Sequence, residues 1–82
     1  MLNDKNLSLF PQLTTLNASS NPNITDASVS KLTQLTVLYA SNNLKITDTS
    51  LCLLTRLTIL DTNVSLKITD ASVSKLTQLT TL

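Results

Sequence analysis

Aspartates that recur at a fixed spacing are the first side chains that could do chemistry. Asp26, Asp48 and Asp70 stand 22 residues apart. A row of carboxylates can bind a hard cation such as Ca²⁺, but the further acidic ligands of a calcium loop are missing around each of them. Each aspartate instead precedes a short stretch with helical spacing. We therefore expect it to be a helix N-cap, which accepts hydrogen bonds from the first free N–H groups.

The nucleophilic side chains lack the partners that would activate them. Cys52 is the single cysteine, and the chain has no histidine that could act as its base or share a zinc ion. Ser30 and Lys31, like Ser74 and Lys75, are adjacent in sequence, and adjacent helical residues do not face each other. We expect no enzymatic activity, no cofactor and no metal site, with Cys52 at the surface or half-buried.

Charge and composition exclude further classes of function. The formal net charge is +1, and the six Lys and Arg residues are scattered singly, so no basic stripe is available for nucleic acid. No apolar run approaches the roughly 18–20 residues of a membrane helix, and the first residues lack the pattern of a signal peptide. We expect neither a nucleic-acid nor a membrane partner. The free thiol slightly favours a cytoplasmic location.

A repeat of 22 residues positions these side chains. The stretch from Ile24 to Leu38 recurs from Ile68 to Leu82 with a single change, and residues 46–60 match it at nine of fifteen positions. The frame extends back to Leu2, which gives one array over residues 1–82, with repeats 2–23, 24–45 and 46–67 and a partial repeat 68–82. A period of this size is typical of a solenoid, in which each repeat buries its apolar face against its neighbours. We expect the chain to be part of a longer array.

Each repeat is predicted to hold one short strand and one short helix. Residues 15–19, 37–41 and 59–63 alternate small or apolar side chains with mostly polar ones, which is the period of a strand. Residues 26–32 have the spacing of a helix but are rich in weak helix formers, so one to two turns of α or 3₁₀ helix are expected. The chain has no glycine, so asparagine is the residue type best able to adopt a left-handed turn in the connections, and Asn21 and Asn43 share one column of the repeat. A buried amide there would bond to backbone groups of adjacent repeats.

Outward positions on the predicted strands are the candidate binding site. Val37 and Tyr39 fall on one strand, and Ile59 and Asp61 occupy the equivalent positions on the next. An aromatic ring with a polar tip, two aliphatic side chains and a charge are suited to a protein-binding patch. The alternative is that these residues only stabilise the sheet as cross-strand neighbours.

The repeated pattern resembles the leucine-rich-repeat family. Leu13-x-x-Leu16-x-Ala18-x-x-Asn21 recurs with the same spacing at residues 35–43 and, with Thr62 and Ser65 in place of the alanine and the asparagine, at residues 57–65. The spacing is similar both to the short internalin-like repeats and to the cysteine-containing repeats of F-box proteins. The resemblance implies an α/β fold: a right-handed coil with a parallel sheet on the concave face, short α or 3₁₀ helices on the convex face, and protein binding on the concave face.

Three functions are consistent with this pattern. The first is a protein-protein interaction module that binds a partner through the concave sheet face. The second is the substrate-recognition or targeting segment of a larger ubiquitin-ligase adaptor or effector protein. The third is a designed or decayed repeat array that has no partner, since near-identical repeats also fit recent duplication or design.

The first and last repeats predict a further property. A repeat array normally needs terminal caps with a polar outer face, yet Leu2, Leu7 and Phe10 occupy apolar columns at one end, and Leu79 and Leu82 do so at the other. We therefore expect marginal stability or end-to-end self-association of the chain.

Overall fold

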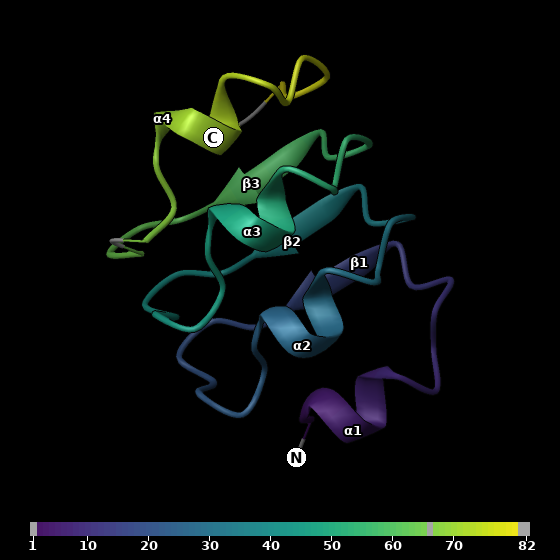
Figure 1. Cartoon of the computed structure of the whole chain (residues 1–82). Coiled ribbons are helices and arrows are strands. Elements are labelled where there is room, and N and C mark those ends of the chain that lie inside the picture. Colours follow the sequence, from purple (N-terminus) through teal and green to yellow (C-terminus); the bar gives the residue numbers. More distant parts are fainter. Residues whose placement is uncertain (1, 66, 81–82) are drawn as a thin grey trace.

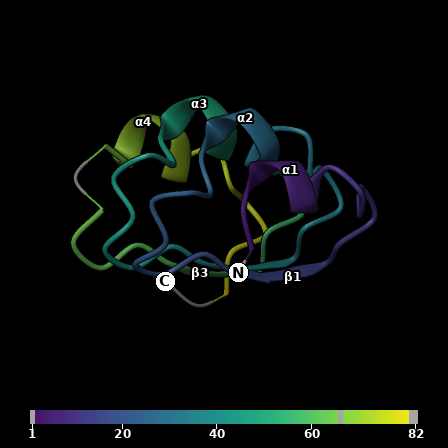
Figure 2. The same cartoon turned by 90° about the horizontal axis from the view of Figure 1, so that it is seen from below.

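Short helices and strands alternate along the chain in the computed structural model, which describes residues 2–65 and 67–80 (Figure 1). The elements are α1 (Asp4–Leu7), β1 (Thr15–Asn17), α2 (Asp26–Val29), β2 (Val37–Tyr39), α3 (Asp48–Leu51), β3 (Ile59–Asp61) and α4 (Asp70–Val73). The strands form a parallel sheet in the order β1-β2-β3. Figure 2 shows the helices in one layer and the strands in a second layer below them. The chain is thus a small α/β domain.

The strand register follows the 22-residue repeat. Leu16 pairs with Leu38, and Leu38 pairs with Leu60, so that equivalent residues of successive repeats lie side by side. We call the repeats 2–23, 24–45, 46–67 and 68–80 the first to fourth units. The strands begin at the predicted residues and are three residues long, two shorter than predicted. Thr81 and Leu82, which the repeat places in a fourth strand, lie outside the described residues.

The apolar core lies between the two layers. Residues from the middle units are fully covered, including Ile24, Leu35, Leu38, Ile46 and Leu57, each with 0% exposure. Burying a side chain of this size stabilises the fold by about 1.5–3 kcal/mol. Two predicted core positions are wrong: Leu2 is 44% exposed and Phe10 is 54% exposed. The equivalent residues of the middle units pack against the units before and after them, whereas the residues of the first unit pack only against the second.

The helices begin one residue earlier than predicted. Their N-caps are Asn3, Thr25, Thr47 and Thr69. The threonine Oγ1 atoms accept hydrogen bonds from the backbone N–H two residues later, at 3.1 to 3.2 Å. The prediction that Asp26, Asp48 and Asp70 are the N-caps is therefore wrong, because the preceding threonine already accepts the bond from the helix. Each aspartate is instead the first helical residue.

The connections from strand to helix contain the left-handed residues. Ser20, Asn42 and Val64 have φ values of 55°, 57° and 61°. These three positions are equivalent in the repeat and lie one residue before the column of Asn21 and Asn43. The expectation that asparagine adopts the left-handed turn is met at Asn42, whereas serine and valine occupy the position in the other two connections. Asn42 fits this conformation, whereas a β-branched valine is unusual in it.

A buried amide does join neighbouring units, as predicted. Asn43 is 2% exposed, and its Nδ2 donates to the carbonyls of Ala18 and Asn21 at 2.9 Å and of Ile24 at 3.2 Å. In the next unit Ser65 occupies this position, and its hydroxyl donates to the carbonyl of Ala40. The connections of successive units are thus held to each other by side chains.

No described helix is both long and apolar enough to span a membrane. The helices are single turns of four residues, at the short end of the predicted length. Cys52 follows α3 directly and is half-buried, as predicted.

Candidate functional site

The four predicted binding residues lie together on the sheet. Val37 pairs with Ile59, and Tyr39 pairs with Asp61, in the register of β2 and β3. Side chains alternate along each strand, so the buried leucines between them face the helices and these four residues face the other side of the sheet. Tyr39 is 37% exposed, and Val37, Ile59 and Asp61 are half-buried. We call this set the sheet-face cluster.

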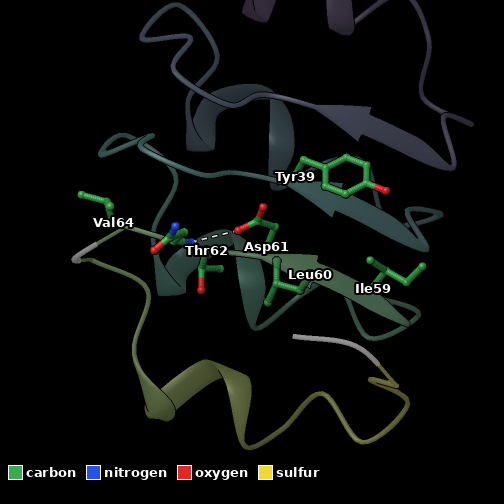
Figure 3. Close-up of a pocket in the computed structure, with 7 residues that line it drawn as sticks. Tyr39, Ile59, Leu60, Asp61, Thr62 and Val64 are labelled. Carbon is green, nitrogen blue, oxygen red and sulfur yellow. Dashed lines mark hydrogen bonds between the residues drawn. The ribbon is translucent and has the colours of Figure 1, made fainter.

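A hollow of about 620 Å³ lies beside the sheet-face cluster. Three of the four predicted residues line it: Tyr39, Ile59 and Asp61. In Figure 3 the Tyr39 ring lies over β2 and the Ile59 side chain extends from the start of β3. Val37 borders Ile59 in the register but does not line the hollow.

The Asp61 carboxylate also has a structural role. Its Oδ1 accepts a hydrogen bond from the backbone N–H of Asn63 at 3.1 Å, which closes the turn after β3 (Figure 3). Asn17, at the equivalent position, accepts the same bond from Ser19 at 3.0 Å. Asp61 is thus held in place by the turn, and its position does not depend on a bound partner.

The sequence analysis missed part of the hollow. Thr62, Asn63 and Val64 line it as well, and they follow β3 directly. The alternation of side chains that predicts the site ends with β3, because the turn after a strand is irregular. The repeat makes Asn63 and Val64 equivalent to Ser41 and Asn42, in the connection that follows β2.

The aspartate column is occupied by contacts between units. Asp26 accepts from the Thr47 backbone N–H at 2.9 Å, from Thr47 Oγ1 at 2.6 Å and from the Ser50 hydroxyl. Asp48 makes the same three bonds to Thr69 and Ser72. Within residues 2–65 and 67–80, no three His, Cys, Asp or Glu side chains are grouped so that they could hold a metal ion. The carboxylates of Asp26 and Asp48 thus each join one unit to the next.

Hydrogen bonds between units lower the pKa of two carboxyl groups, that of Asp48 and that of Asp4, which lies one repeat before Asp26 and bonds to Thr25 and Ser28. The hydrogen bonds from Ser72 and then Thr69 lower the pKa of Asp48 below its usual value of 3.8. For Asp4, partial burial acts to raise the pKa, but the bonds from Ser28 and Thr25 outweigh it and lower the pKa overall. Bonds to the ionised form favour ionisation. Both groups are therefore anionic acceptors at neutral pH.

The nucleophilic side chains considered in the sequence lie at the C-terminal ends of helices. Ser30 and Ser74 are the C-caps of α2 and α4, and Cys52 is the C-cap of α3. The backbone N–H of each bonds to the aspartate at the start of its own helix. These residues thus have equivalent structural positions.

Comparison with known proteins adds no relative. A scan against protein-family models finds no match, and a search of curated proteins finds no similar sequence.

Proposed function

We propose that this chain is a leucine-rich-repeat solenoid that binds a protein partner through the sheet-face cluster. The fold part of the proposal is a right-handed coil with the sheet on its concave face and the helices on its convex face. Two findings support it: the 22-residue register of the sheet, and the Asn43 amide that bonds to carbonyls of the preceding unit. The leucine spacing in the sequence supports the family assignment.

The observation that carries the functional part is the exposed Tyr39 beside Ile59 and Asp61. Tyrosine offers a large contact area with a polar tip, and such residues are enriched in binding hot spots. The helix layer lies on one side of the sheet (Figure 2), and these side chains alternate along the strands with the buried leucines that face it. A partner segment in the hollow would bury the ring and the aliphatic side chains together.

The chemistry of the cluster restricts the partner. Asp61 is the one acidic residue of the three described strands, and it has no basic neighbour on those strands. A complementary segment would place an apolar side chain over Ile59 and a hydrogen-bond donor or a cation near the Asp61 carboxylate. The proposal includes no catalytic step.

The test is a selection of peptides from a displayed random library on the folded chain, followed by titration of the enriched peptides. Replacing Tyr39 by alanine is expected to weaken binding by about 1–3 kcal/mol. Replacing Lys31, which is exposed and follows α2, is the control and is expected to have little effect. Equal losses in the two variants, or no loss with Tyr39→Ala, would refute a site on the sheet face.

A further inference from the structure

The connections from strand to helix lie along one edge of the molecule, the left edge in Figure 1. We call this edge, formed by residues 20–23, 42–45, 63–65 and Lys67, the connection edge. Successive connections are bonded to each other: the backbone N–H of Asn42, for example, donates to the carbonyl of Asn63 at 2.7 Å. The strands follow one another in the order β1-β2-β3, so the connection edge runs along the side of the units. A further unit before the first or after the fourth would lengthen this edge and would not cover it.

Apolar side chains and a hollow lie on the connection edge between the first two units. Leu44 is 50% exposed, and Pro22, at the equivalent position of the first unit, is exposed as well. A hollow of about 290 Å³ is lined by these two residues and by Ser20, Asn42, Asn43 and Lys45. The buried Asn43 amide holds the two connections together, because its Nδ2 donates to two carbonyls of the first unit. The walls of the hollow are therefore fixed by the fold.

The connection edge also carries positive charge. Lys45 and Lys67 occupy equivalent positions in the second and third units, and both are exposed. The residues of the connection edge include no aspartate or glutamate. Asp26 and Asp48, which begin the helices after the connections, accept hydrogen bonds from the threonine of the next unit. The edge therefore attracts anionic groups.

The backbone beside Lys45 offers one more donor. The N–H of Lys45 donates to Asn43 Oδ1 at 2.9 Å, whereas the N–H of Leu44 bonds to no acceptor among the described residues. A carboxylate placed beside Leu44 would accept from this N–H and from the Lys45 ammonium group. Hydrogen bonds to an ionised acceptor are stronger than those between neutral groups.

From the apolar hollow and the positive charge beside it, we propose that the connection edge binds an extended acidic segment of a partner protein. An apolar side chain of the segment would occupy the hollow against Pro22 and Leu44, and two carboxylates would bind Lys45 and Lys67. Alternate side chains of an extended segment point the same way. The segment would therefore have acidic residues two and four positions after its apolar residue. This site is separate from the sheet-face cluster and does not rest on the function proposed for it.

The number and kind of groups favour a peptide over other polyanions. Binding of nucleic acid takes its affinity from many phosphate contacts, and clusters of about four to eight basic residues are typical of attraction to an anionic membrane. The described part of the connection edge has two lysines, and they lie beside a small apolar hollow. A peptide with one apolar side chain and a few carboxylates matches these groups.

The first experiment is a titration of the chain with a fluorescein-labelled peptide, Ser-Leu-Ser-Glu-Ser-Glu-Ser, followed by fluorescence polarisation. Binding is expected to saturate and to weaken as the salt concentration rises, because salt screens exposed charges. The same peptide with glutamine in place of both glutamates is expected to bind about fivefold more weakly, as expected for the loss of two exposed ion pairs. Equal binding of the two peptides, or no saturable binding of the glutamate peptide, would overturn the proposal.

Variants of the chain test where the peptide binds. Lys45→Gln and Lys67→Gln are each expected to weaken binding by about two- to fivefold, the effect of one exposed ion pair, and Leu44→Ser is expected to weaken it through lost apolar contact. Lys31→Gln, the same change at an exposed position after α2, is the control, and Tyr39→Ala tests the sheet-face cluster; neither should change binding. Circular dichroism establishes that each variant is folded. Equal losses with Lys31→Gln and Lys45→Gln, or a loss only with Tyr39→Ala, would overturn the proposal.

A sedimentation experiment with vesicles distinguishes a peptide from a membrane. The chain is mixed with vesicles of phosphatidylcholine and with vesicles that also contain phosphatidylserine, and it is expected to remain in the supernatant with both. If the chain sediments with the phosphatidylserine vesicles and Lys45→Gln abolishes this, the connection edge binds an anionic membrane, and the peptide proposal is overturned.

Discussion

Replacing Val64 by asparagine is expected to stabilise the protein. Val64 has φ = 61°, in the left-handed region where an L-residue is disfavoured by about 1–2 kcal/mol and a β-branched one is rare. Ser20 and Asn42 have nearly the same φ at the equivalent positions. The repeated path of the connection therefore sets this conformation, whatever residue occupies the position.

The size of the effect follows from two opposing contributions. Asparagine relieves most of the backbone penalty of about 1–2 kcal/mol, because its short polar side chain tolerates this region. The valine side chain is 58% exposed, so its loss removes only a minor part of the roughly 1.5–3 kcal/mol of a fully buried residue. The expected net gain is about 1 kcal/mol, which raises the Tm by about 4–8 °C in a domain of this size.

The assay is thermal unfolding followed by circular dichroism, at one fixed protein concentration so that self-association does not change the apparent Tm. Asn42→Val is the matched control, because it places valine in the same conformation one unit earlier, and it is expected to lower the Tm by a similar amount. If Val64→Asn leaves the Tm unchanged or lowers it, and Asn42→Val has no effect, the left-handed position is not strained and the reasoning is refuted.

Three further predictions concern the contacts between units. Ser65→Asn is expected to raise the free energy of unfolding by about 1 kcal/mol, because an amide can donate to more carbonyls of the preceding unit than a hydroxyl can. Urea unfolding measures this free energy, and a loss of stability would contradict the prediction. Asp26→Ala is expected to lower the free energy of unfolding by about 1–3 kcal/mol, because the bonds of the carboxylate to the next unit are lost. Thr49→Ala is the control: Thr49 is exposed, and the second and fourth units have alanine at this position. It should change the free energy of unfolding by under about 0.5 kcal/mol. The pKa values of Asp4 and Asp48 are lower in the folded than in the unfolded chain, so the stabilisation that these groups provide is present above pH 3.8 and is lost as the pH falls below it. The Tm should be nearly constant from about pH 7 to about pH 5 and should then decrease. A Tm that rises on acidification would contradict the assignment.

The repeat made much of the fold predictable. Because side chains 22 residues apart had to be equivalent, the positions of the strands and the buried role of Asn43 followed from the spacing, whereas the parallel sheet was implied by the resemblance to leucine-rich repeats. The N-cap could not be assigned in the same way, because threonine and aspartate are both good caps and are adjacent here. What decides between Thr25 and Asp26 is a contact with the next unit, which no property of a single unit reveals.

The candidate site was predictable in position but not in extent. Alternation along the strands placed Tyr39 and Asp61 on the same face, and the register set them side by side. The role of Asp61 in the turn and the contribution of Val64 to the hollow depend on how the chain leaves β3. A left-handed valine contradicts local preference, so only the path of the neighbouring connections could have indicated it. The binding function itself stays a prediction.

Asn43 and Ser65 occupy equivalent positions but differ in side chain, and this difference affects how the protein unfolds. Nearly all of its long-range hydrogen bonds join residues 19 to 25 positions apart, so each unit forms its contacts with its immediate neighbours and can be lost separately. In this column the Asn43 amide donates to two carbonyls of the first unit, whereas the Ser65 hydroxyl donates to one carbonyl of the second unit. Partial unfolding should therefore begin at this junction and release the third and fourth units while the first two stay paired. Amide hydrogen exchange would then divide the chain into a slowly exchanging half and a rapidly exchanging half, with the boundary between β2 and β3.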